Sequence, residues 1–158
     1  MSYKIDKFFY LIIILVSFFS ILSALFVEHV LLIQPCKLCL YQRIPYIFSI
    51  IVCFFGIFFP QNKIWIYLLI IVFIGSVSIS GYHVGIENKL FTEFSGCTND
   101  NINTIDKSEL LQNLNNFLPN CKDVNFRILG LSLATINFLL SIALTAIVIR
   151  YFIYEKNR

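Results

Sequence analysis

The chain has 158 residues, of which 58% are hydrophobic and 13% are charged, and its mean hydropathy is +0.81. About a quarter of the residues in a soluble domain are charged, so this composition excludes an ordinary soluble protein and predicts one that lies in a membrane. Half of the twelve cations behind the net charge of +3 flank apolar segments, and no basic cluster is interleaved with aromatic residues, so nucleic-acid binding has no support.

Four apolar segments are long enough to cross a bilayer, and they cover residues 8–27, 40–59, 64–86 and 128–149. About twenty residues of α-helix span the roughly 30 Å of hydrocarbon. Because the backbone must satisfy its own hydrogen bonds there, runs of this length predict helices rather than barrel strands. The predicted fold class is an all-α membrane protein, a four-transmembrane-helix bundle forming a single integral membrane domain over residues 1–158.

Lysine and arginine residues indicate the orientation of this bundle. Six cations crowd the two ends of the chain and the short middle turn: Lys4, Lys7, Lys63, Arg150, Lys156 and Arg158. The opposite side, residues 28–39 and 87–127, carries five cations over a much longer stretch. The positive-inside rule therefore predicts cytoplasmic termini and loops that face a periplasm-like space, where disulfides persist. The first segment resembles a signal peptide, but its long apolar run, followed by no clear cleavage site, favours a retained helix.

The long loop contains one stretch with helical order. Asp106 and Glu109 resemble a capping box, and apolar residues then repeat at helical spacing as far as Pro119. This pattern predicts a short helix on the membrane surface. The helix either only packs on the bundle or also limits how far Cys121 moves towards Cys36.

Four of the five cysteines lie on the predicted outer side. Cys36 and Cys39 are separated by two residues, the spacing of thiol–disulfide exchange motifs, in which one sulfur attacks and the other resolves the mixed disulfide. Cys97 and Cys121 lie in the long loop, so the two pairs form a candidate electron path. Cys53 lies in the middle of the second span and is expected to be an inert packing residue.

Two further residues are candidates near the first pair. Cys39 directly precedes the second span, where free N–H groups and the helix dipole favour a thiolate, and Arg43 one turn later would add positive charge. The alternative for Arg43 is a contact with lipid phosphate. His83, beside Tyr82 at the outer end of the third span, fits an interfacial polar residue.

Residues 34–43, with the sequence QPCKLCLYQR, resemble the signature of the disulfide bond formation protein B family, DsbB. Residues 82–87, which close the third span, and 129–134, which open the fourth, add to the resemblance, and it covers nearly the whole chain. The CxLCxxQR element together with a distal cysteine pair is specific, whereas a lone CxxC is not. The chain departs from many members at Ile136, where they carry an aromatic residue, and in the detail of the long loop.

The resemblance implies a thiol:quinone oxidoreductase of the bacterial inner membrane. Such an enzyme reoxidises a periplasmic DsbA-like oxidase of thioredoxin fold and passes the electrons to ubiquinone or menaquinone from the quinone pool of the lipid bilayer. A quinone is needed because DsbA lies near −120 mV, a potential at which another protein disulfide provides little driving force.

The resemblance also implies roles for individual residues. The partner would attack a Cys97–Cys121 disulfide at Cys97, and the freed Cys121 would attack Cys36. Cys39 would then be left as a thiolate that faces the quinone. Arg43 would stabilise this thiolate and negative charge on the quinone ring, and His83 would form a hydrogen bond with a quinone oxygen.

Three other interpretations remain open at this stage, although no metal is expected. Cys36, Cys39 and His83 have residue types that bind zinc, but such a site leaves the distal pair unexplained. A scaffold with two structural disulfides would never change its redox state, and a haem attachment site would need histidine where Leu40 lies. Vitamin K epoxide reductase-like enzymes share the chemistry, but their CxxC follows the loop pair in sequence.

Overall fold

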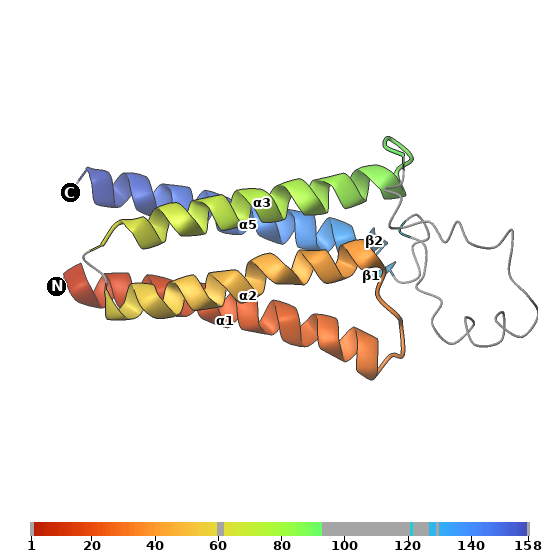
Figure 1. Ribbon diagram of the computed structural model, residues 1–158, viewed down its shortest axis with the longest axis horizontal. Helices are drawn as coiled ribbons and strands as arrows, with labels where there is room; N and C mark the ends of the chain where they lie inside the picture. Colours follow the sequence, from red (N-terminus) through yellow and green to blue (C-terminus); the bar gives the residue numbers. More distant parts are fainter. Residues whose placement is uncertain (1, 60–61, 93–120, 122–126, 129, 158) are drawn as a thin grey trace, which may run out of the picture.

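Four long helices form the structure, a computed structural model that describes residues 2–59, 62–92, 121, 127–128 and 130–157, without the side chains of residues 2–6 and 156. The helices are α1 (Ser2–His29), α2 (Lys37–Phe58), α3 (Ile64–Glu87) and α5 (Leu133–Lys156). Each contains a window long and apolar enough to cross a membrane. Packing of α1 on α2, α2 on α3 and α3 on α5 gives an elongated bundle, so the predicted four-helix membrane fold is confirmed (Figure 1).

Two helices begin at positions that differ from those expected. α2 begins at Lys37 rather than at residue 40, because the Cys36 sulfur accepts a hydrogen bond from the Cys39 backbone N–H at 3.3 Å and caps the helix. α5 begins at Leu133 rather than at residue 128. Two short antiparallel strands, β1 (Arg127–Ile128) and β2 (Leu131–Ser132), precede it, and the Ser132 hydroxyl caps the helix.

Small polar residues and aromatic side chains share the interior of the bundle. Hydroxyl pairs join α1 to α2 through Ser17 and Ser49, and α3 to α5 through Ser76 and Ser141, each pair at 2.8 Å. Within a bilayer the hydrophobic effect does not drive helices together, because the lipid tails are as apolar as the side chains. Close packing and such hydrogen bonds hold the helices together instead. Large apolar side chains on the opposite helix faces are exposed in the isolated chain, as expected for surfaces that meet lipid.

The bundle has two chemically different ends. α1 begins and α5 ends at one of them, together with the turn between α2 and α3 (Figure 1). Cys36, the end of α3 and the start of α5 lie at the other, which we call the cysteine end. The shared location of the two termini fits the even number of spans. The predicted loop helix at residues 106–119 and Cys97 lie outside the described residues.

Candidate active site at the cysteine end

The cysteine pair lies at the first turn of α2, and both sulfurs are free thiols only 2.8 Å apart. Cys36, and not Cys39, occupies the N-cap of α2. The free N–H groups and the dipole at this helix end therefore favour a thiolate at Cys36. A hydrogen bond from the Cys39 thiol is the main reason that the pKa of Cys36 falls from 9.0 to about 5. Burial acts in the opposite direction, and His83 and the Cys39 backbone lower this pKa further. The reduced pair therefore holds its negative charge on Cys36.

His83 extends from α3 to the cysteine pair and is almost completely buried. Its Nε2 lies 3.6 Å from the Cys36 sulfur and 3.8 Å from Glu87 Oε1, and its Nδ1 lies 2.9 Å from Gln42 Nε2. Since an amide nitrogen can only donate, Nδ1 accepts this hydrogen bond and Nε2 carries the imidazole proton. The Nε2–H group faces the Cys36 sulfur.

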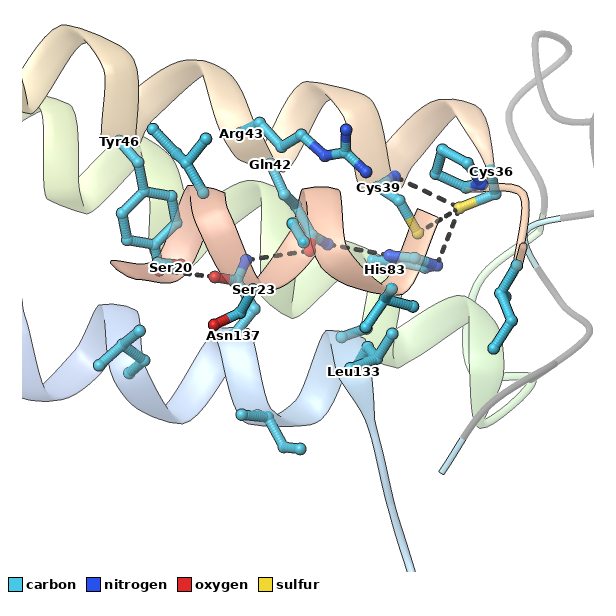
Figure 2. Close-up of a pocket in the computed structure, with 18 of the residues that line it drawn as sticks. Ser20, Ser23, Cys36, Cys39, Gln42, Arg43, Tyr46, His83, Leu133 and Asn137 are labelled. Atoms are coloured by element: carbon cyan, nitrogen blue, oxygen red, sulfur yellow. Dashed lines mark hydrogen bonds between the residues drawn. The ribbon is translucent and has the colours of Figure 1, made fainter. Parts of the chain in front are cut away.

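A chain of hydrogen bonds continues from His83 into the bundle (Figure 2). Asn137 of α5 donates from Nδ2 to Gln42 Oε1 at 2.9 Å, and the Tyr46 hydroxyl donates to Asn137 Oδ1 at 2.5 Å. Tyr46 also contacts the Ser141 hydroxyl at 3.1 Å. Three helices thus share one polar network, which begins at the cysteine end.

Sequence reasoning predicted only His83 of this network as a site residue and missed its four other members, Gln42, Tyr46, Asn137 and Ser141. Gln42 could have been found from its position three residues after Cys39, on the same helix face. Asn137 could have been found as a carboxamide in an otherwise apolar span, because polar side chains within a membrane usually have a partner or a function.

Arg43 forms an ion pair with Glu28 at the end of α1, with 2.6 Å between Nη1 and Oε2. The two side chains are 17% and 28% exposed, so the pair is partly shielded from solvent. Arg43 also lines the same cavity as Cys39. The structure therefore offers the arginine a protein partner, which the lipid-phosphate alternative did not include. Its expected effect on a Cys39 thiolate stays a prediction.

A cavity of about 390 Å³ opens among these side chains, between α1, α2, the end of α3 and the start of α5. Its wall is largely apolar, and its polar lining includes both cysteines of the pair, Gln42, Arg43, His83 and Asn137. Pockets of about 300–1,000 Å³ with apolar walls and a few polar groups are typical of small-molecule sites. Ile136, where the family resemblance led us to expect an aromatic residue, also lines the cavity.

The remaining cysteines separate into two environments. Cys121 is disulfide-bonded and buried, and it packs against Cys36, Leu38 and Ile86 at the cysteine end. Its predicted partner, Cys97, lies outside the described residues. Cys53 is a free thiol with no exposed surface in the apolar core. The structure thus brings Cys121 next to Cys36 and keeps Cys53 apart from both.

The three donor atoms of the zinc alternative do lie close together. The sulfurs of Cys36 and Cys39 and a ring nitrogen of His83 are all within 4.8 Å of one another. These distances alone would allow a metal ion, so the zinc alternative stays open, and it still leaves the distal cysteine pair without a role.

Comparisons with known proteins identify the family of the chain. The family model described as disulfide bond formation protein DsbB matches residues 6–150. The chain is also similar to the uncharacterized protein RP370 of Rickettsia prowazekii (strain Madrid E), with 26% identity over 153 residues, which cover 93% of this chain and 88% of the relative. Membership of the family implies oxidoreductase activity in disulfide bond formation, with a DsbA-type partner and a location in a membrane. Since the family match extends through all four helices, this chain belongs to the DsbB family of disulfide bond formation proteins.

Proposed function

We propose that this protein reoxidises a periplasmic DsbA-like oxidase and delivers the electrons to a membrane quinone, either ubiquinone or menaquinone. The observation that carries the proposal is the shared cavity. Cys36 and Cys39, Arg43, His83 and the disulfide-bonded Cys121 all line one space large enough for a small molecule. A structural disulfide would not need a cavity beside it, whereas a redox pair that exchanges electrons with a small molecule does.

The proposed relay consists of two disulfide exchanges. A thiolate of the partner attacks Cys97, which breaks the Cys97–Cys121 bond, and the partner's second thiol releases Cys97 as the partner becomes oxidised. Cys121 then attacks the Cys36–Cys39 disulfide at Cys36, and Cys97 displaces Cys36 to restore the loop disulfide. Each exchange breaks one S–S bond and forms another. The two electrons therefore end on the Cys36–Cys39 dithiol, and the partner has lost two electrons and two protons.

The cavity residues fit a quinone head group by the chemistry of their donors. When bound, a quinone supplies the electron sink, because it takes up two electrons and two protons as it becomes a quinol. Arg43 would hold a ring oxygen by its positive charge, and His83 would share its one N–H group, at Nε2, between the Cys36 sulfur and a ring oxygen. The largely apolar wall would suit the ring itself.

The same proposal fixes the orientation of the chain in the bacterial inner membrane. The cysteine end would face the periplasm and the two termini the cytoplasm. The cation distribution supports this orientation, since Lys7, Lys63 and Arg150 belong to the end of the bundle opposite the cysteines. A fusion of alkaline phosphatase within residues 93–120 should be active, and a fusion after the last residue should be inactive.

Quinone reduction by the purified protein tests the proposal. Reduced DsbA-type partner should drive reduction of short-chain ubiquinone or menaquinone, and Cys36→Ser should abolish it. Cys53→Ser is the matched control, since it removes a thiol of the same helix outside the cavity, and it should retain turnover. If the intact protein exchanges disulfides with the partner but never reduces either quinone, the electron acceptor has been assigned wrongly.

A further inference from the structure

Each hydrogen bond between Tyr46 and His83 has a defined donor and acceptor, and the series starts with the Tyr46 hydroxyl as donor. A phenol donates a hydrogen bond better than it accepts one, because its oxygen lone pair is delocalised into the ring. The Tyr46 hydroxyl lies 2.5 Å from Asn137 Oδ1, an atom that can only accept. This contact turns the other end of the amide, Nδ2, towards Gln42 Oε1 at 2.9 Å.

The orientation of the Gln42 amide then determines which group faces His83. With its oxygen engaged by Asn137, Gln42 has only its Nε2 left to face the imidazole, and the Nε2–Nδ1 distance is 2.9 Å. A ring nitrogen that accepts from an amide carries no proton, so the neutral imidazole must be the Nε2–H tautomer. Nε2 in turn lies 3.6 Å from the Cys36 sulfur.

We propose that Asn137 is a positioning residue, which acts through Gln42 to hold His83 in the Nε2–H tautomer so that this proton faces the Cys36 sulfur. Asn137 contacts neither cysteine, and it comes from a different helix from either Cys36 or His83. An apolar side chain at position 137 would free Gln42 to rotate by half a turn. Gln42 could then accept from Nδ1–H, and a lone pair on Nε2 would face the sulfur.

The consequence concerns charge on Cys36. An Nε2–H group pointing at the sulfur favours its thiolate form, whereas an Nε2 lone pair repels it. The inference deepens the proposed thiol–quinone function, because it names what keeps the Cys36 sulfur ready to ionise when an exchange releases it. The tautomer itself is a property of the resting protein and does not depend on any quinone.

Nitrogen NMR of the full-length protein in nanodiscs tests the proposal directly. The chain has two histidines, so ¹⁵N-histidine labelling gives two ring systems, and His29→Gln assigns them. Reduced wild-type protein at neutral pH should show the Nε2–H tautomer alone at His83. Asn137→Leu should convert it to a mixture or to the Nδ1–H tautomer, and the thiolate absorbance of the reduced protein at pH 7 should decrease.

A second variant covers the case in which Asn137→Leu fails to fold. Tyr46→Phe removes only the hydroxyl that orients Asn137, and it should also produce a tautomer mixture. Ser17→Ala is the control, since it removes another buried hydrogen bond between helices, to Ser49, and it should leave the His83 signals unchanged. The proposal is wrong if wild-type His83 shows the Nδ1–H tautomer, or if Asn137→Leu and Tyr46→Phe both keep a pure Nε2–H tautomer. Normal NMR results without quinone reduction would instead count against the proposed function.

Discussion

Cys36 and Cys53 are both buried thiols associated with α2, and they differ in their polar surroundings rather than in their burial. Cys36 is 6% exposed and Cys53 is 0% exposed. Cys36 caps a helix, accepts a backbone N–H group and lies near an imidazole, whereas Cys53 belongs to a cluster of apolar residues. The difference lies in the polar partners, which can stabilise a thiolate at one site and are replaced by hydrocarbon at the other.

The two halves of the bundle repeat this contrast on a larger scale. At the cysteine end, amide, imidazole, carboxylate and guanidinium groups surround a cavity. Towards the other end, aromatic rings pack on each other, including Phe9 on Tyr151 at 3.8 Å and Phe55 on Trp65 at 5.5 Å between ring centroids. The cysteine end holds the proposed reaction site, and the aromatic contacts of the other half pack the helices together. Four predictions test this division.

The largest effect is expected from the cysteines of the proposed relay. Changing any one of Cys36, Cys39, Cys97 or Cys121 to serine should abolish reoxidation of the partner, because each takes part in a separate bond exchange. Cys53→Ser should keep near-normal turnover, since among the described residues its sulfur packs in the apolar core with no polar partner. The measurement is steady-state oxidation of the reduced partner. Retained turnover in Cys97→Ser would rule out the relay as drawn.

Removing the charge of Arg43 should affect the rate of quinone reduction more than the stability of the fold. Arg43→Ala should sharply slow quinone reduction and leave a single turnover of partner oxidation intact, while Arg43→Lys should keep part of the activity, because the charge remains but the planar fork is lost. Stability should change little, since partly exposed ion pairs contribute about 0–1 kcal/mol.

Glu28→Gln is the matched variant for this ion pair, because it removes the other half of the 2.6 Å contact and keeps the guanidinium. It should lower thermal stability about as much as Arg43→Ala while retaining more quinone reduction. Equal loss of quinone reduction in the two variants would mean that the ion pair, and not the arginine itself, supports the reaction.

The stability of the reduced protein should depend on pH through Cys36. The pKa of Cys36 in the folded reduced protein is about 5, against 9.0 for a free thiol. Between these values the unfolded chain binds more protons than the folded one, so the stability of the reduced protein should rise with pH. This contribution is fully present above pH 9.0 and is lost as the pH falls through about 5. Thermal unfolding of reduced wild-type protein and Cys36→Ser should therefore diverge with rising pH, and parallel curves would contradict the assignment of charge to Cys36.

The smallest effect is expected at the aromatic half. A Cβ atom on Gly56 would lie 2.8 Å from the buried Tyr10 ring, whereas one on Gly75 would meet nothing within 4 Å. Gly56→Ala should lower stability by about 1–3 kcal/mol through overpacking between α1 and α2. Gly75→Ala is the control and should change it little. Thermal unfolding in detergent measures both, and equal midpoints would show that the Tyr10 ring moves aside at little cost.

The sequence by itself determined the four helices and identified the cysteine pair as a candidate for thiol–disulfide exchange. Apolar runs of about twenty residues leave the backbone few alternatives in a bilayer, so helix number follows from length and hydropathy. The CxLCxxQR element and the distal cysteine pair are likewise visible in the sequence without any knowledge of helix packing. Helix ends were less certain, because they depend on single capping contacts. The Cys36 sulfur begins α2 earlier than expected, and the short β1–β2 hairpin delays the start of α5.

Only the tertiary structure decided which polar residues meet at the site. Asn137 lies 95 positions from Gln42 in the sequence, and Glu28 lies 15 positions before Arg43, yet each pair forms a hydrogen bond. Such pairings depend on how each helix is rotated about its axis and on its depth relative to its neighbours. Helices in lipid have apolar residues on nearly every face, so the amphipathic pattern that reveals rotation in a soluble protein is weak. The identity of the buried faces, and with it the direction of the Tyr46–Asn137–Gln42–His83 chain, therefore emerged only from packing.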